Sequence, residues 1–171
     1  MGDLKALCRS IQDFPKEGIL FYDITPMLRE GESFRQVIDG IGERYQDKQI
    51  DIVVSIEARG FIIGPAIAYK LGAGVVPVRK KGKLPWHCYQ ATYELEYGTD
   101  VLEIHRDAIK PGERVLIFDD LLATGGTARA VTDLVRKMGG EIVEVAFMIE
   151  LLDLAGREKL QDYPVFSLIQ Y

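Results

Sequence analysis

The 171-residue chain is poor in cysteine, tryptophan and histidine, with two, one and two residues respectively. Cys8 and Cys88 lie far apart and fit no metal-binding or redox spacing, so we expect both to be reduced thiols. The sequence also lacks an apolar run near the roughly 18 residues that span a bilayer. Its first residues lack the basic and apolar regions of a signal peptide. From these absences we expect a cytoplasmic protein with no membrane partner.

An excess of positive charge is missing as well. The 21 Lys and Arg residues are outnumbered by 26 Asp and Glu residues, which gives a formal net charge of −5. Proteins that bind nucleic acids usually carry a net basic face, so we expect no nucleic-acid partner. Hydrophobic residues, in contrast, make up 47% of the chain. That share and this length predict a single globular domain over residues 1–171.

Short apolar runs alternate with helical patterns along most of the chain. The expected strands cover residues 50–56, 74–78, 114–120 and 141–151. Helical patterns end at Gly72 and at Gly139. Because each helix must pack back onto the sheet, the alternation predicts an α/β fold with a mostly parallel twisted sheet and helices on both faces. Ligands bind at the carboxyl ends of such strands, which selects the loops after Ile56, Val78 and Phe118.

Two regions depart from this alternation. Residues 92–98 alternate in polarity and turn into residues 101–105, which predicts an antiparallel hairpin. Residues 79–91 before them are too polar and irregular for a core, and so long a loop is usually a lid or a binding loop. At the front we expect a short helix, an ordered extension over the core and a longer helix, at residues 4–11, 14–28 and 33–45.

A glycine-rich turn follows the strand at 114–120. Gly125 and Gly126 permit the positive-φ turns that point successive N–H groups inward. Thr124 and Thr127 add hydroxyl donors, and the next helix adds the positive end of its dipole. The turn lacks the lysine of a P-loop and the spacing of a dinucleotide-binding loop, so it favours a terminal phosphate monoester instead.

Asp119 and Asp120 stand just ahead of this turn. Two carboxylates are natural acceptors for a pair of vicinal hydroxyls. The turn and the acids together therefore predict a ribose 5-phosphate better than a bare phosphate. The alternative is a capped helix start with two solvated acids, which the full segment VLIFDDLLATGGT disfavours.

This segment closely resembles the phosphoribosyl-pyrophosphate (PRPP) signature of the type I phosphoribosyltransferases: four apolar residues, two acids and a loop ending in TGGT. Other segments resemble the branch of that family that uses adenine, in the expected order and over nearly the whole chain. They are FPKEGILFYDITPML, EARGFIIGPAIA, VRKKGKLP, YELEYG, GREKL and FSLIQY. The resemblance implies the type I phosphoribosyltransferase fold, with a hood at about residues 79–108.

The resemblance also implies an activity. The protein would be a pentosyltransferase of purine salvage that condenses adenine with PRPP to give AMP and pyrophosphate, through an oxocarbenium-like transition state. It would act as a homodimer with Mg²⁺, and the ion would be held mainly by substrate and water. Two alternatives stay open: a phosphoribosyltransferase for another purine base, and a PRPP-sensing regulator. A regulator would call for a DNA-binding domain or a basic face.

Residue roles follow from the resemblance for the phosphate and the ribose. The 5-phosphate would bind the signature loop, at Ala123, Thr124, Gly125, Gly126 and Thr127. Asp119 and Asp120 would accept from the ribose hydroxyls, and their charge would suit a sugar that becomes oxocarbenium-like. Pyrophosphate would bind the EARG loop and the basic run after it, at Glu57, Ala58, Arg59, Gly60, Arg79, Lys80 and Lys83.

The residues of the EARG loop themselves also indicate an anion-binding site. Gly60 lets the backbone approach an anion at a helix start, and Arg59 supplies a fork of donors for phosphoryl oxygens. The family often has a non-proline cis peptide here, which would fall at Glu57–Ala58. Ala58 stands where many members have serine.

The resemblance places the base and the hood as well. Adenine would lie among apolar side chains while backbone groups read its edge, at Leu20, Phe21, Tyr22 and Leu151. Tyr22 stands where many members have arginine. In the hood, Glu96 would exchange a proton with a purine ring nitrogen, and Tyr97 would lie beside it.

Overall fold

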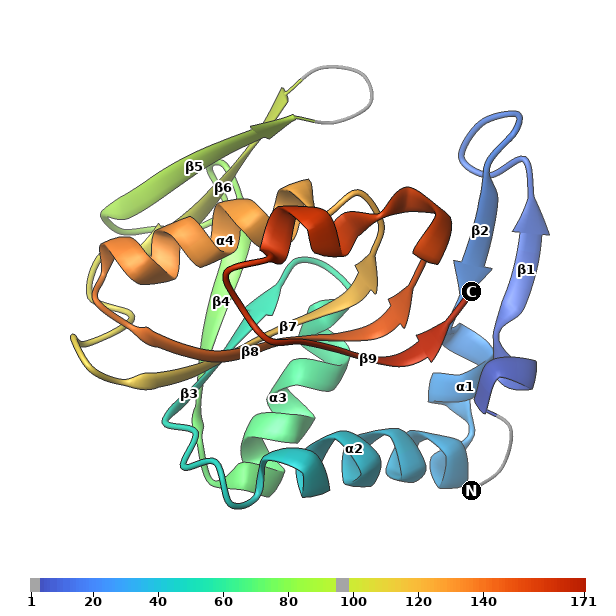
Figure 1. The fold of residues 1–171 in the computed structure, drawn as a ribbon, viewed down its shortest axis with the longest axis horizontal. Helices are drawn as coiled ribbons and strands as arrows, with labels where there is room; N and C mark the ends of the chain where they lie inside the picture. The colour runs from blue at the N-terminus through green and yellow to red at the C-terminus, as the bar shows by residue number, and fades with distance from the viewer. Residues whose placement is uncertain (1–3, 95–98) are drawn as a thin grey trace.

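The computed structural model describes residues 4–94 and 99–171, and its centre is a seven-stranded sheet (Figure 1). The strands of this sheet are β3 (Ile52–Ile56), β4 (Gly74–Lys80), β5 (Cys88–Glu94), β6 (Thr99–His105), β7 (Arg114–Leu122), β8 (Glu141–Glu150) and β9 (Val165–Gln170). Their order is β5-β6-β4-β3-β7-β8-β9. The pairs from β4 through β9 in that order are parallel, and the two pairs that involve β6 are antiparallel. This confirms the predicted mostly parallel sheet with an antiparallel hairpin.

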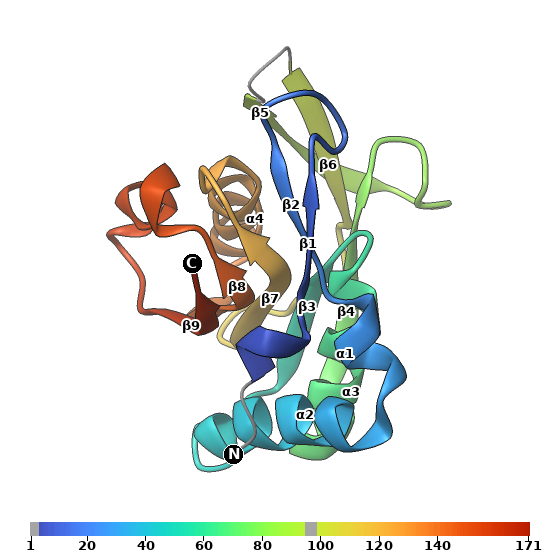
Figure 2. The same ribbon diagram turned by 90° about the vertical axis from the view of Figure 1, so that its right-hand side faces the viewer.

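Helices cover both faces of the sheet, as predicted (Figures 1 and 2). The longer ones are α2 (Gly31–Tyr45) and α3 (Gly60–Leu71) on one face and α4 (Gly126–Lys137) on the other. Alternate residues of β7 divide between the two cores: Ile117 packs toward α4, and Phe118 packs toward α2 and α3. None of the helices in the described residues is long and apolar enough to cross a membrane.

The periodic apolar residues of α4 are buried as the sequence predicts. Their exposed fractions are 8% or less, at Ala130, Val131, Leu134, Val135 and Met138. Helix α3 ends where expected, because Gly72 adopts φ 67° and its N–H caps the carbonyl oxygens of the last turn. Such a left-handed residue is the usual terminator of a helix, and glycine adopts it without strain.

The front of the chain is partly different from the prediction. Only residues Leu4–Leu7 are helical, as the 3-10 helix η1, and Arg9–Gln12 form strand β1. The reason is a partner: β1 pairs antiparallel with β2 (Leu20–Asp23) in a separate two-stranded sheet. A short helix α1 (Thr25–Arg29) then leads into α2, which contains the longer helix that was predicted.

The region at 79–91 is also more regular than predicted. Arg79 and Lys80 extend β4, and residues 88–91 belong to β5, so only residues 81–87 lie between strands. Strand β6 explains this, because it pairs with both β4 and β5 and satisfies their backbone groups. In Figure 1 this hairpin and the β1–β2 hairpin stand at opposite ends of the view, with the carboxyl ends of β7 and β8 between them.

Candidate active site

Asp119 and Asp120 lie within β7 rather than in a loop after it. The strand continues to Leu122, because β8 is long enough to pair with it as far as Glu150. Each aspartate is only 8% exposed. The alternative of two solvated acids, which the full segment disfavoured, is therefore wrong.

Burial disfavours the ionised form of the two aspartates. It raises the pKa of Asp119 well above its usual range, and the neighbouring charge of Asp120 raises it further. Burial also raises the pKa of Asp120, although Arg59 opposes that effect. The Arg59 Nε lies 2.6 Å from Asp120 Oδ2, and the Asp120 N–H donates to Asp119 Oδ1 at 2.8 Å. Among the residues that the structure describes, the pair thus has one cationic partner for two carboxyl groups.

Arg59 reaches this pair from the neighbouring strand. It caps α3 just after β3, and its guanidinium lies over the Phe21 ring, 4.8 Å from the ring centroid. The peptide bond between Glu57 and Ala58 is cis, as the family resemblance implied. A Cβ on Gly60 would lie 3.3 Å from the Phe118 carbonyl oxygen and 3.4 Å from Asp119 Oδ1. The close approach that Gly60 permits is therefore to β7.

The glycine-rich turn lines a small cavity at the start of α4. Its volume is about 170 Å³, and its lining runs from Leu121 to Ala128. Gly125 adopts φ 78° as the N-cap of α4, but Gly126 is already helical, so the prediction of two positive-φ glycines is half wrong. One left-handed residue is enough to turn the chain, after which the first N–H groups of α4 lack partners in the helix. These groups are suited to an anion.

A second glycine supports this turn from outside. A Cβ on Gly125 would lie 2.4 Å from the Gly156 carbonyl oxygen, and a Cβ on Gly156 would lie 2.2 Å from the Ala123 carbonyl oxygen. Gly156 begins the 3-10 helix η3 (Gly156–Leu160). In the sequence this segment, GREKL, is notable only as part of the family resemblance, which assigns it no role. The two backbones touch at positions where neither can carry a side chain.

Two cations of the basic run, Arg79 and Lys80 at the end of β4, are paired with acids. Arg79 donates to Glu57 from Nε at 3.2 Å, and the Lys80 Nζ lies 3.0 Å from Asp100 Oδ2. Burial alone would raise the pKa of Glu57, but hydrogen bonds from Arg79 and from the Lys80 N–H outweigh it and lower that pKa. Lys83 is exposed. The carboxyl ends of β3 and β4 thus hold a cluster of alternating charge.

The residues predicted to hold a base divide between two sides of β2. Tyr22, Leu20 and Leu151 line one cavity of about 370 Å³, and Tyr22 stacks on Tyr171 with ring centroids 3.9 Å apart. Phe21 points the other way, toward Arg59, because successive residues of a strand face opposite sides. Leu151 follows β8 directly, and its N–H donates to the Leu122 carbonyl oxygen at 2.9 Å.

Two predicted residues, Glu96 and Tyr97, lie outside the described residues.

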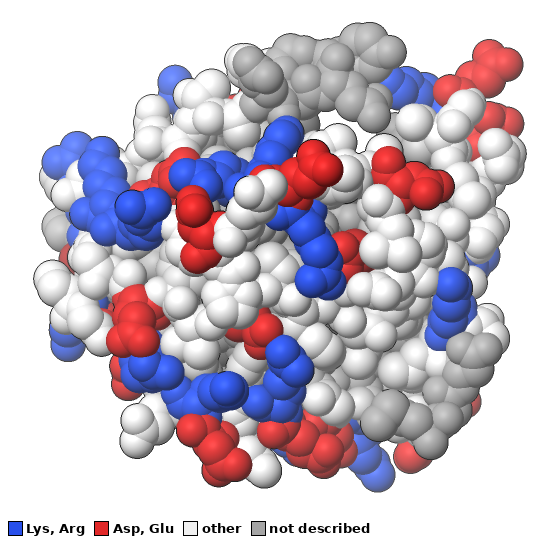
Figure 3. Space-filling view, viewed as in Figure 1, with Lys and Arg blue, Asp and Glu red and all other residues white. Residues whose placement is uncertain are grey.

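Across residues 4–94 and 99–171, no group of three or more His, Cys, Asp or Glu side chains could hold a metal ion. Figure 3 shows Lys and Arg interspersed with Asp and Glu over one face of the molecule.

Comparison with known proteins gives a consistent result over the whole chain. A family model for the phosphoribosyl transferase domain matches residues 26–170. The adenine phosphoribosyltransferase of Trichlorobacter lovleyi is 61% identical over 171 residues, which is all of both chains. The crystal structure of the Thermoanaerobacter pseudethanolicus adenine phosphoribosyltransferase superposes with a TM-score of 0.96 at 48% identity, covering 99% of this chain and 98% of that one. The Saccharomyces cerevisiae enzyme, complexed with an imino-altritol bisphosphate and adenine, gives 0.93 at 45%, covering 97% and 96%.

Proposed function

The chain belongs to the adenine phosphoribosyltransferases of the phosphoribosyltransferase family, and on that premise we propose that it transfers the phosphoribosyl group of PRPP to adenine. The products are AMP and pyrophosphate, which makes the protein a glycosyltransferase of purine salvage. One observation carries this proposal: two buried aspartates lie between a phosphate-sized cavity at the start of α4 and the arginine that follows β3. We propose one domain over residues 1–171, with a hood at about 79–108.

The turn at the start of α4 would hold the 5-phosphate. The proposed ligands are Ala123, Thr124, Gly125, Gly126 and Thr127, all of which line the cavity there. Unpaired N–H groups and the positive end of the helix dipole attract a phosphate dianion. A cavity of about 170 Å³ suits one phosphoryl group better than a chain of three.

Asp119 and Asp120 would bind the ribose through its hydroxyls. Asp119 accepts the Asp120 N–H, and within the described part of the chain Arg59 is the cation paired with Asp120. Negative charge in this low-dielectric position would stabilise the oxocarbenium-like sugar as its bond to pyrophosphate breaks. The proposed catalytic residues are Asp119, Asp120, Arg59 and Glu96.

Pyrophosphate would bind where β3 and β4 end. The proposed residues are Glu57, Ala58, Arg59, Gly60, Arg79, Lys80 and Lys83. Three of the cations are already paired, Arg59 with Asp120, Arg79 with Glu57 and Lys80 with Asp100. Pyrophosphate binding would therefore exchange carboxylate partners for phosphoryl oxygens, which form equally charge-assisted hydrogen bonds.

Adenine would lie beside β2 against Leu151. Leu20, Tyr22 and Leu151 line the same cavity, and Phe21 lies on the Arg59 side of the strand. We propose that the base inserts at this strand so that apolar side chains cover its faces and backbone groups read its edge. Glu96 would then exchange a proton with the purine ring, and Tyr97 would close over the ribose.

Mg²⁺ is proposed as the cofactor. Its preferred ligands are oxygen atoms, and it usually keeps several waters and substrate oxygens. The carboxylate oxygens of Asp119 and Asp120 fit such an ion bound with PRPP, although no side chain is assigned as a direct ligand. When bound, the ion would neutralise charge on the leaving pyrophosphate.

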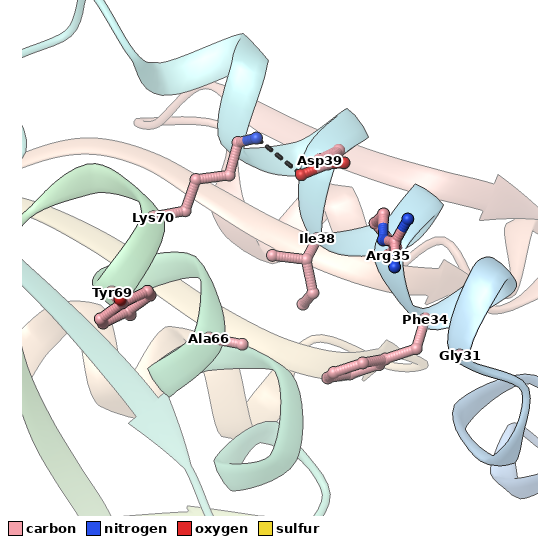
Figure 4. Close-up of a pocket in the computed structure, with 8 residues that line it drawn as sticks. All are labelled: Gly31, Phe34, Arg35, Ile38, Asp39, Ala66, Tyr69 and Lys70. Atoms are coloured by element: carbon pink, nitrogen blue, oxygen red, sulfur yellow. Dashed lines mark hydrogen bonds and ion pairs between the residues drawn. The ribbon is translucent and has the colours of Figure 1, made fainter.

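A homodimer is proposed as well. The groove between α2 and α3 has a volume of about 530 Å³, with apolar side chains along it (Figure 4). Tyr69 on its rim is 90% exposed, and Ile62 on the same helix is 49% exposed. An exposed apolar surface of this kind is typical of a subunit interface. Light scattering tests the dimer: we expect the wild type to be a dimer and Tyr69→Lys to shift it toward monomer.

We also propose that the protein is cytoplasmic.

An assay with four bases tests the function. Purified protein is incubated with PRPP, Mg²⁺ and either adenine, hypoxanthine, guanine or xanthine, and nucleotide products are separated by chromatography. We expect AMP from adenine and little product from the other three bases. Absence of AMP would refute the proposal, and preferred use of another purine would assign the protein to that base.

A further inference from the structure

The 3-10 helix η3 lies against the phosphate-binding turn without lining its cavity. Gly156 contacts the backbone at Ala123 and Gly125 so closely that an added Cβ would lie 2.2 Å from the Ala123 carbonyl oxygen. Gly156 itself is buried, and Ala155 before it has a left-handed φ of 49°. The position of this turn therefore depends on where η3 is held.

Arg157 fixes η3 to the ends of two strands. Its guanidinium donates to Glu150 from Nε at 2.5 Å and from Nη2 at 2.7 Å, and its Nη1 donates to the Val165 carbonyl oxygen at 2.9 Å. Glu150 is 3% exposed, and it also accepts from Ser167 and from Gln170. The hydrogen bonds from Arg157 lower the pKa of Glu150, so this buried group stays a carboxylate.

We infer that Gly156 and Arg157 are positioning residues for the 5-phosphate. Arg157 anchors η3 to β8 and β9, and Gly156 transmits that anchor to the backbone that holds the phosphate. Neither residue touches substrate. This inference rests on the proposed function for the identity of the phosphate ligand, but it concerns residues to which that function assigns no role.

The consequence is a selective loss of affinity. Displacing the turn by about an ångström misaligns its N–H groups, and misplacement on that scale can cost on the order of a hundredfold. The base side should change less, because Leu151 is held through the backbone carbonyl oxygen of Leu122, whereas a Cβ on Gly156 would meet Leu122 only at its side-chain atoms. A purely structural role would instead weaken all ligands together.

Gly156→Ala tests this, with Gly40→Ala as the control. Gly40 lies in α2, and a Cβ there would meet nothing within 4 Å. We expect Gly156→Ala to raise the KM for PRPP and the Kd for ribose 5-phosphate about tenfold or more, with less than a twofold change in the KM for adenine. Gly40→Ala should leave all three within twofold. Circular dichroism establishes that each variant is folded.

Arg157→Lys is the second variant and decides the matter if Gly156→Ala does not fold. Lysine keeps the charge but loses the forked contact with Glu150, so the same selective loss is expected at roughly threefold. Equal rises in the KM for PRPP and for adenine, or unchanged binding of ribose 5-phosphate, would overturn the inference. A wild type that binds ribose 5-phosphate but makes no AMP would contradict the proposed function alone.

Discussion

Buried carboxylates lie near the carboxyl ends of the neighbouring strands β7 and β8, but the hydrogen-bond donors around them differ. Glu150 on β8 accepts hydrogen bonds from Arg157, Ser167 and Gln170, and its pKa is lowered. On β7, Asp120 is paired with Arg59 and Asp119 accepts the Asp120 N–H, and burial raises the pKa of both aspartates. Exposure does not explain the contrast, because all three are 8% exposed or less.

We propose that this difference separates a residue that holds the fold from residues that bind a ligand. A buried carboxylate with a full set of donors is stable as it stands, whereas one with too few donors costs free energy until something else supplies them. Under the proposed function, the ribose hydroxyls would supply them here. The hydrogen-bond partners, rather than the burial, thus distinguish Glu150 from the two acids that we propose to bind the ribose.

The largest expected effect is on turnover. Asp119→Asn with Asp120→Asn should lower kcat by about 10²–10³, because the charge that stabilises the cationic sugar is removed. The free energy of unfolding should stay the same or rise, since two buried charges are removed. Steady-state kinetics and urea unfolding measure the two quantities. Asp162→Asn is the control, because that side chain is 63% exposed and remote from the acids. A large loss of stability in the double variant would make the aspartates structural.

The next effect is on stability. Glu150→Gln should lower the free energy of unfolding by roughly 2 kcal/mol, since it weakens several hydrogen bonds to a buried carboxylate while Arg157 stays partly solvated. Glu141→Gln at the other end of β8 is the control. That side chain is 57% exposed, and its loss should cost less than about 0.5 kcal/mol. Equal losses in the two variants would remove the distinction drawn for Glu150.

The third effect is on pH dependence. The raised pKa of Asp119 means that its contribution to stability is present below its unfolded pKa of about 3.9 and is lost as the pH rises above it. The lowered pKa of Glu150 means that its contribution is present above about pH 4.3 and is lost as the pH falls. Unfolding measured between pH 3 and pH 7 should therefore show that the free energy of unfolding of Asp119→Asn increases relative to that of the wild type as the pH rises. The deficit of Glu150→Gln should shrink below about pH 4. Parallel curves for all three proteins would contradict the assigned charge states.

The sequence predicted one of these two regions and not the other. Asp119 and Asp120 stand next to a glycine-rich turn in one continuous segment, so their chemistry is visible in the order of residues. The hydrogen-bond partners of Glu150 come from two other elements, η3 and β9, and nothing in the local sequence around it indicates that Arg157, Ser167 and Gln170 converge there. The contact between Gly125 and Gly156 is missed for the same reason, since it exists only after folding.

The fold was predicted better than the boundaries of its elements. Strands β3, β4, β7 and β8 and helices α2, α3 and α4 followed from apolar periodicity, which is the strongest local signal, whereas β9 was not among the expected strands. Residues 79–91 were expected to form a loop because they are polar, yet β6 pairs with both ends of that stretch. Pairing with a strand that is distant in sequence determines whether such a segment forms a strand, and the local composition does not reveal that pairing.

The smallest expected effect is on the base. Leu151 follows Glu150 directly, and Leu151→Ala should raise the KM for adenine about tenfold through lost apolar contact. The KM for PRPP should change little. Leu20→Ala is the comparison, because that side chain is 42% exposed and should cost less. If Leu151→Ala instead raised both KM values equally, Leu151 would support the strand rather than the base.

Product stoichiometry tests the central claim most directly. The wild type is supplied with Mg²⁺, PRPP and adenine, and AMP and pyrophosphate are measured together, with adenine omitted in parallel. The account predicts equal amounts of the two products and very little pyrophosphate without adenine, because the sugar is transferred to the base. Pyrophosphate without AMP, or no product at all, would contradict it.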